Sequence, residues 1–173
     1  MNRNVAFLRA INVGGHTVRM EQLRALFEEL KLANVETFIA SGNVIFDARG
    51  KPGRVMEQKI ERHLRARLGY DVATFLRSGD ELRSLAEHAA FPGERGDLYV
   101  TFTAEPLDDA QRLAVDGLRT RSDDFHVNGR EIYWLRRDRA STLGGYLLEK
   151  AIGVPATVRN MNTVQRLLAK VGT

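Results

Sequence analysis

The chain has 173 residues, of which 43% are hydrophobic and 28% charged, and it contains no cysteine. This composition suits a packed protein of one domain or two small ones, and it excludes disulfides, thiolate nucleophiles and cysteine metal sites. No apolar run approaches the roughly 18 residues of a membrane span, and the first residues enter a strand pattern without a signal-peptide core. We therefore expect a cytoplasmic protein with no membrane partner.

The net charge is +4, and most of the basic residues are arginine. An excess of arginine is typical of phosphate or nucleic-acid contact, because guanidinium groups bind phosphate through two hydrogen bonds. Here the arginines alternate with acidic residues, as in IERHLRARLGYD at residues 60–71. A net charge of +4 spread over the whole chain produces only a weak electrostatic field. The excess of arginine is explained more simply if arginine occupies ordinary solvent-exposed positions. We therefore favour nucleic acid less as a partner.

The first half of the chain has the pattern β-α-β-β-α-β, which is the split βαβ of the ferredoxin-like fold. Ser41-Gly42-Asn43 separates two strand patterns as a hairpin turn. Pro52 suits the first turn of the second helix, and Gly69 suits its end. The expected strands cover residues 3–10, 35–40, 44–48 and 71–77, and the expected helices cover residues 20–31 and 52–68.

The second half repeats this order without obvious residue identity. Ser78 and Glu81 have capping-box spacing and predict a connecting helix through Ala90, followed by a breaker-rich linker. Asn128-Gly129 predicts a second hairpin. The expected strands cover residues 98–103, 125–127, 131–135 and 156–159, and the expected helices cover 108–118, 143–152 and the segment around 164–171. We predict an α+β protein with two tandem ferredoxin-like (βαββαβ) subdomains and antiparallel sheets, at residues 1–90 and 97–173.

The loop after the first strand and the hairpin turn form the first candidate site. In this fold a right-handed crossover makes the first two strands parallel, with the third between them, so Arg9 and the hairpin are expected at the same edge of the sheet. Arg9 supplies a positive fork, and glycines allow the positive φ that turns backbone N–H groups toward an anion. Each motif is also an ordinary turn by itself. The candidate ligand-binding residues are Arg9, Asn12, Gly14, Gly15, Ser41, Gly42 and Asn43.

A second candidate site precedes the last helix, in the segment from Arg159 to Thr163. Asn160 or Asn162 suits a helix N-cap, which is the simpler interpretation of either residue. In the functional interpretation, Arg159 and the open helix end hold a carboxylate or phosphate together with Asn160, Asn162 and Thr163. No histidine has a partner at metal-ligand spacing, so no metal site is expected.

At FLRAINVGG, FIASGNVIF, NGREIYWL and GVPATVRNMNT the chain resembles a bacterial family, domain of unknown function 1697. The resemblance covers nearly the whole chain in the same order, and it implies a cytosolic protein with two ferredoxin-like subdomains. It implies no activity, substrate or cofactor, and the candidate residues of both sites fall on family-typical positions. Ala10 stands where the family commonly has Gly, Met161 where it has Trp, and Thr142 where it has Lys. These departures weaken any role that needs a second cation or an aromatic wall there.

Three functions are consistent with these patterns. The first is binding of a small anionic or polar ligand at the Arg9 loop and the adjacent hairpin. The second is an enzyme that uses the same cleft, although the sequence names no base, nucleophile or cofactor for it. The third is binding of RNA or single-stranded nucleic acid, in which Phe7 and Phe46 on the first and third strands stack bases. VIFDA lacks the basic-aromatic signature of such modules, and core packing explains both phenylalanines more simply. The sequence does not predict the oligomeric state.

Overall fold

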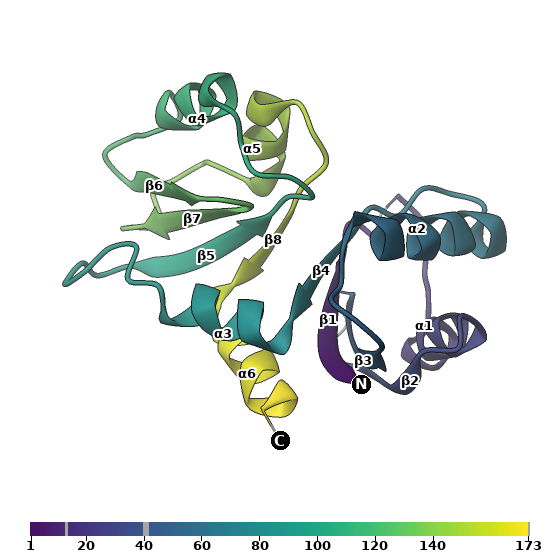
Figure 1. Ribbon diagram of the computed structural model, residues 1–173. Coiled ribbons are helices and arrows are strands. Elements are labelled where there is room, and N and C mark those ends of the chain that lie inside the picture. Colours follow the sequence, from purple (N-terminus) through teal and green to yellow (C-terminus); the bar gives the residue numbers. More distant parts are fainter. Residues whose placement is uncertain (13, 40–41, 173) are drawn as a thin grey trace. The chain divides into compact units, whose positions relative to one another are not determined.

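A computed structural model describes residues 1–12, 14–39 and 42–172 (Figure 1). The chain divides into two units, of which the first contains Met1–Ser84 and Arg166–Thr173 and the second contains Leu85–Gln165. The last helix therefore contributes residues to both units. The boundaries at residues 90 and 97 that the sequence suggests remain a proposal.

The elements of the first unit are β1 (Asn2–Leu8), α1 (Met20–Glu29), β2 (Ala33–Thr37), β3 (Asn43–Ala48), α2 (Arg54–Leu68), β4 (Thr74–Ser78) and the start of α3 (Gly79–Glu87). The sheet has the order β2-β3-β1-β4, and every neighbouring pair is antiparallel. Because β1 and β2 both pair with β3, they run parallel to each other. This is the ferredoxin-like arrangement, so the predicted fold is confirmed for this unit.

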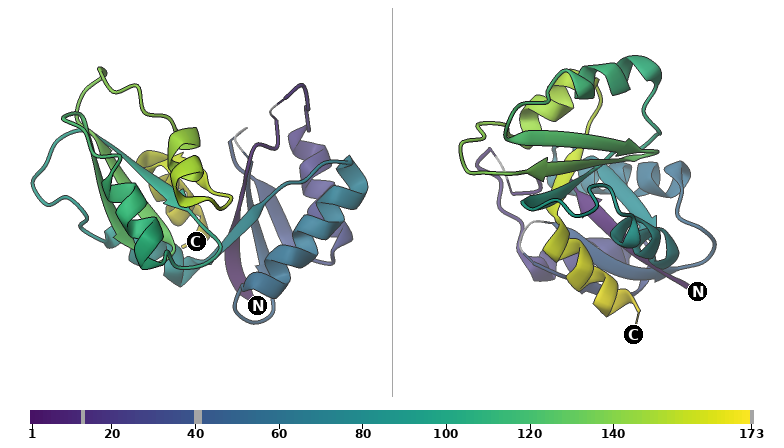
Figure 2. Two further views of the ribbon diagram at one scale, coloured as in Figure 1. Left: turned by 90° about the horizontal axis from the view of Figure 1, so that it is seen from above. Right: turned by 90° about the vertical axis from the view of Figure 1, so that its left-hand side faces the viewer.

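Helices α1 and α2 cover one face of the first sheet (Figures 1 and 2). Alternate residues of a strand point to the same face, and Ala6 and Leu8 of β1 join the core under the helices. Phe27 of α1 packs on Phe46 of β3, with ring centroids 5.8 Å apart. Other buried members of this core are Leu23, Leu26, Val35, Val44, Ile60, Leu64, Val72 and Leu76. The buried apolar residues of α1 and α2 therefore face the sheet.

The elements of the second unit are β5 (Asp97–Phe102), α4 (Asp109–Asp116), β6 (Asp123–Asn128), β7 (Glu131–Arg136), α5 (Gly145–Ile152), β8 (Thr157–Asn160) and the first turns of α6 (Met161–Val171). Its sheet has the order β6-β7-β5-β8 and is also antiparallel throughout. Helices α4 and α5 cover one face of it (Figure 1). The order of elements is that of the first unit, so the prediction of two similar subdomains is confirmed.

The core of the second unit is built around Trp134 on β7. Its ring stacks on Tyr99, with centroids 4.8 Å apart, and on Phe125 at 6.4 Å. The hairpin that joins β6 to β7 turns at Asn128-Gly129, where Gly129 has a φ of +61°. The predicted hairpin is therefore present, and glycine provides the left-handed conformation that its turn requires.

Strand β2 ends at Thr37, earlier than the predicted residue 40. Ile39 has a φ of +61°, which lies outside the β region and which a β-branched residue rarely adopts, so the extended backbone does not continue through it. The ring of Phe38 lies under the guanidinium of Arg166 at 5.1 Å and under the ammonium of Lys170 at 5.3 Å, both on α6. These cation–π contacts hold Phe38 to the last helix. Arg166 and Lys170 are more than 120 residues from Phe38 in sequence, so the local sequence pattern does not reveal these contacts.

Strand β4 lies at the edge of the first sheet, and its outward backbone N–H groups are all covered by glutamates. An uncovered edge would present a row of unpaired N–H groups to other chains. Three alternate residues of β4 donate to carboxylates of α2 and α3. The pairs are Thr74 N with Glu61 Oε1 at 3.0 Å, Leu76 N with Glu57 Oε1 at 2.9 Å, and Ser78 N with Glu81 Oε2 at 2.9 Å. The last pair completes the predicted capping box, because Glu81 N also donates to Ser78 Oγ at 3.2 Å.

Candidate functional site

The end of β1 lies beside the turn that leads into β3. The backbone N–H of Leu8 donates to the carbonyl of Gly42 at 2.9 Å, and the N–H of Arg9 donates to the carbonyl of Ala73 at 2.9 Å. Arg9 is half-buried where it leaves the sheet. Three segments that are far apart in sequence therefore meet at one sheet edge in the first unit: the loop after β1, the turn before β3 and the segment before β4.

The loop after β1 is held at its base by side chains. Asn12 Oδ1 accepts the backbone N–H of Val18 at 2.7 Å, which closes the loop. The hydroxyl of Tyr70 donates to the carbonyl of Ile11 at 2.8 Å, and burial raises the pKa of this phenol, so it remains a donor at neutral pH. The ring of His16 stacks on Tyr70, with centroids 3.8 Å apart. The loop is thus anchored at both sides of its tip.

The tip of this loop contains the glycine pair. Gly14 and Gly15 have φ values of +70° and +82°, both are exposed, and a Cβ at either position would meet open space. Their positive φ favours glycine, because residues with a side chain rarely adopt it. Neither N–H group donates a hydrogen bond to another residue in the described part of the chain.

The turn residues before β3 have a structural explanation. A Cβ on Gly42 would lie 2.9 Å from Ile11 Cγ2 and 3.2 Å from Leu8 Cβ, so only glycine allows the turn to approach β1 this closely. Asn43 is fully buried, and its Nδ2 donates to the carbonyl of Phe38 at 3.0 Å. Ser41 lies outside the described residues. Among the described residues of this group, the exposed ones are Asn12, Gly14 and Gly15, all in the loop after β1.

The second predicted group, Arg159 to Thr163, lies in the second unit, at the passage from β8 into α6. Asn160 Oδ1 accepts the N–H of Asn162 at 2.8 Å, so Asn160 has the capping role that the sequence suggests. Arg159 is 7% exposed, and its Nη1 donates to Thr157 Oγ1 at 2.8 Å and to the carbonyl of Val158 at 2.9 Å. Burial lowers the pKa of Arg159 to about 10, which still leaves it charged at neutral pH. Asn162 is exposed and Thr163 is half-buried.

Sequence reasoning missed a corresponding arginine in the first unit. Arg77 is the penultimate residue of β4, is fully buried, and donates from Nη1 to the carbonyl of Leu76 at 2.8 Å. Arg159 has the same place in β8 and makes the same bond to its preceding carbonyl. Both strands continue directly into a helix. The repeated pattern of Ala-Thr followed by Arg, at residues 73–77 and 156–159, was the signal in the sequence.

Asp123 is a buried carboxylate at the start of β6 that holds three donors. Its Oδ1 accepts from Trp134 Nε1 at 2.8 Å and from Ser141 Oγ at 2.6 Å, and its Oδ2 accepts from Thr120 Oγ1 at 2.8 Å. Burial by itself would raise the pKa of Asp123, but the hydrogen bonds from Ser141, Trp134 and Thr120 outweigh it and lower the pKa. The carboxylate therefore remains ionised and anchors the segment before α5 to the core.

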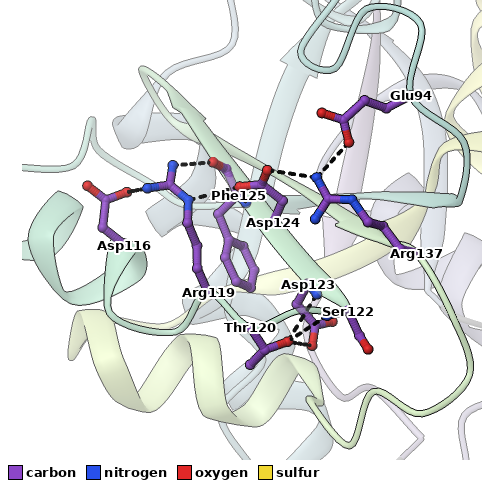
Figure 3. A network of polar contacts seen from close by, with 9 residues as sticks. All are labelled: Glu94, Asp116, Arg119, Thr120, Ser122, Asp123, Asp124, Phe125 and Arg137. Atoms are coloured by element: carbon purple, nitrogen blue, oxygen red, sulfur yellow. Dashed lines mark hydrogen bonds and ion pairs between the residues drawn. The ribbon is translucent and has the colours of Figure 1, made fainter.

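The neighbouring Asp124 is equally occupied (Figure 3). It accepts from Arg119 Nε at 2.8 Å and from Arg137 Nη2 at 3.1 Å, and Arg137 also pairs with Glu94 at 2.6 Å. These donors lower the pKa of Asp124 although burial opposes them. An acid–base pair needs one carboxyl that holds a proton near neutral pH, and neither Asp123 nor Asp124 does. The network is a structural clamp.

Two histidines of the second unit share a hydrogen bond. Nε2 of His88 lies 2.9 Å from Nε2 of His126, and the two rings are stacked. Burial lowers the pKa of His126, and the charges of His88, Arg112 and Arg119 lower it further. One of the two rings must donate and the other accept, so the pair is favoured when at least one histidine is neutral.

We expect this pair to make the second unit sensitive to mild acid. Because the pKa of His126 is below its ordinary 6.5 in the folded chain, the unfolded chain takes up a proton first as the pH falls. Stability is therefore present above about pH 6.5 and is lost as the pH falls from there toward the folded pKa. Urea unfolding at pH 7.5 and 5.0 should show a smaller loss in His126→Gln than in the native chain. An equal loss in both would contradict this role.

Among the described residues, no group of three or more histidine, aspartate or glutamate side chains could hold a metal ion. A helix with the length and apolarity to cross the bilayer is likewise missing from the described ranges.

These features define an α+β protein of two ferredoxin-like units, with candidate binding residues in the connections at the sheet edges. The chain belongs to the family described as "Protein of unknown function (DUF1697)", whose model matches residues 1–133. It is similar to the conserved bacterial protein SP0830 from Streptococcus pneumoniae, with 25% sequence identity and a TM-score of 0.79 over 100% of this chain and 99% of that one. A search of curated proteins found no match.

Proposed function

We propose that the chain binds a small molecule with a phosphate or carboxylate group at the loop after β1. The main support is the hydrogen bond from Leu8 N–H to the carbonyl of Gly42, which brings the start of the loop that carries Arg9 beside the turn before β3. Gly14 and Gly15 lie at an exposed loop tip in the left-handed conformation that lets successive N–H groups converge on an anion. The anchors at Asn12 and Tyr70 reduce the loss of loop entropy on binding.

Arg9→Ala is expected to abolish the thermal stabilisation that a bound anion gives. At about ten times its Kd, a ligand stabilises the folded chain by roughly 1.4 kcal/mol, which raises the Tm by about 3–5 °C at this size. The measurement is a thermal-shift titration with inorganic phosphate, succinate and a panel of phosphorylated metabolites. Arg9→Lys should retain part of the shift, because it keeps the charge and loses the planar fork.

Arg62→Ala is the matched control, since Arg62 is an exposed arginine of α2 in the same unit. It should leave the ligand-induced shift unchanged. The proposal would be refuted if the ligand raised the Tm of Arg9→Ala as much as that of the native chain, with both proteins folded as judged by circular dichroism. A shift lost equally in Arg62→Ala would indicate general charge screening.

An enzyme that acts in the same place is the alternative. Such an enzyme would need a general acid or base near the loop. Tyr70 donates a hydrogen bond to the loop, and His16 stacks on Tyr70, so these two titratable side chains are the candidates. RNA binding has less support, because Phe46 packs on Phe27 in the core under the helices and offers no ring for base stacking.

A further inference from the structure

A cavity of about 510 Å³ lies between the end of α1 and the start of α2 in the first unit. Its floor is apolar, with Leu30 and Leu32 on one side and Met56 and Ile60 of α2 on the other. Val55 also lines it and is 81% exposed. The volume lies within the range of about 300–1,000 Å³ that small-molecule sites have.

Cationic side chains line the same cavity. Lys51, Arg54 and Lys59 are among its described lining residues, and no acidic residue is. Arg54 is partly neutralised by ion pairs with Glu57 at 3.0 Å and Glu61 at 3.3 Å. Lys51 and Lys59 are exposed and form no ion pair with another described residue. Two uncompensated ammonium groups therefore stand beside an apolar floor.

We propose that this cavity binds a single-chain anionic amphiphile of the fatty-acid class. Its acyl chain packs on the leucines, Met56 and Ile60, and its carboxylate lies near Lys51 and Lys59. A wholly apolar ligand would gain nothing from the lysines, and a highly polar one would lose solvation on this floor. Gly53, the N-cap of α2, gives the helix no side-chain cap, so the positive helix end adds to the attraction for an anion. The residues are separate from those of the Arg9 loop, so the two sites are tested independently.

Titration with octanoate, decanoate and dodecanoate below their micelle concentrations, followed by ¹H–¹⁵N NMR, tests the proposal. The affinity should rise about fourfold for each added methylene, because each buried CH₂ contributes a constant transfer free energy. Amide shifts should concentrate at residues 30–32 and 51–60. 1-Decanol, which has no charge, should bind more weakly than decanoate.

Val55→Asp is the first variant, because it places a negative charge at the cavity and removes an aliphatic group. The side chain is exposed, and an acid in the first turn of a helix is favourable, so the fold should be kept. We expect decanoate affinity to fall at least tenfold. Lys51→Gln and Lys59→Gln should each weaken it about two- to fivefold, as the loss of an exposed ion pair does. Lys150→Gln, an exposed lysine of α5 in the other unit, should have no effect.

The proposal is overturned if no decanoate binding is seen near the micelle concentration, or if affinity is independent of chain length. It is also overturned if Val55→Asp binds decanoate as the native chain does, or if amide shifts lie outside this cavity. Concentration-dependent self-association in sedimentation that Val55→Asp abolishes, without decanoate binding, would assign the surface to a second copy of the chain instead.

Discussion

Asp123→Ala is expected to lower the free energy of unfolding of the second unit by about 3 kcal/mol. The carboxylate is 2% exposed and accepts from Trp134, Ser141 and Thr120. Alanine leaves the indole N–H without an acceptor in the core, and one unsatisfied buried donor costs about 1–3 kcal/mol. The two hydroxyls are closer to solvent and can turn to water, so their share comes from the lost charge-assisted bonds.

Trp134 is the single tryptophan of the chain, so its fluorescence in a urea titration reports on this site. Asp123→Asn is the conservative variant, because an amide keeps one acceptor oxygen but turns its NH₂ group toward a donor. It should lose less stability than alanine. If Asp123→Ala had the same unfolding midpoint and the same tryptophan emission as the native chain, the carboxylate would not be an anchor.

Asp123→Ala should also change how the stability of the second unit responds to strong acid. Because the pKa of Asp123 in the folded chain is below its ordinary 3.8, its stabilisation is present above about pH 3.8 and is lost as the pH falls through the folded pKa. Asp123→Ala has already lost that contribution. Its stability should therefore decline less below pH 4 than that of the native chain.

The order of the elements could be predicted because the signals for it are local. Apolar spacing identified α1 and α2, Gly69 in the left-handed conformation ends α2, and Asn128-Gly129 forms the turn between β6 and β7. The expected meeting of the β1 end with the turn before β3 came from topology alone, and Leu8 N–H bonds to Gly42 there. This adjacency needs only the strand order, which follows from the fold.

The sequence does not show contacts that form between distant segments. Phe38 reads as part of a strand, but its ring lies against Arg166 and Lys170 of α6. Ser141 and Asp123 are 18 residues apart in sequence, yet the hydroxyl of Ser141 donates to the carboxylate of Asp123. The apolar cavity depends on the spacing between α1 and α2, which helical periodicity does not determine. For the same reason, no local pattern identifies Glu57 as a buried partner of β4.

Glu57→Ala is expected to destabilise the first unit by about 2–3 kcal/mol. Glu57 is 1% exposed, and its Oε1 accepts the N–H of Leu76 at 2.9 Å on the outer edge of β4. Alanine suits a helix, so α2 itself should be unharmed. The cost comes from the buried N–H of Leu76, which loses its acceptor in the folded unit. The ion pair with Arg54 adds little, because Arg54 is 40% exposed.

Amide hydrogen exchange measures this effect at one residue. In Glu57→Ala the amide of Leu76 should exchange faster than in the native chain, beyond the change at Phe75, whose N–H faces β1. Glu57→Gln is the matched control, since its amide oxygen can still accept from Leu76, and it should keep most of the protection. Glu61→Ala, at a half-buried position, should cost less than Glu57→Ala and act on Thr74. Because an uncovered edge strand pairs with other chains, heating Glu57→Ala should also give more light scattering than heating Glu57→Gln. Equal protection of Leu76 in all three variants would show that the glutamates do not shield β4.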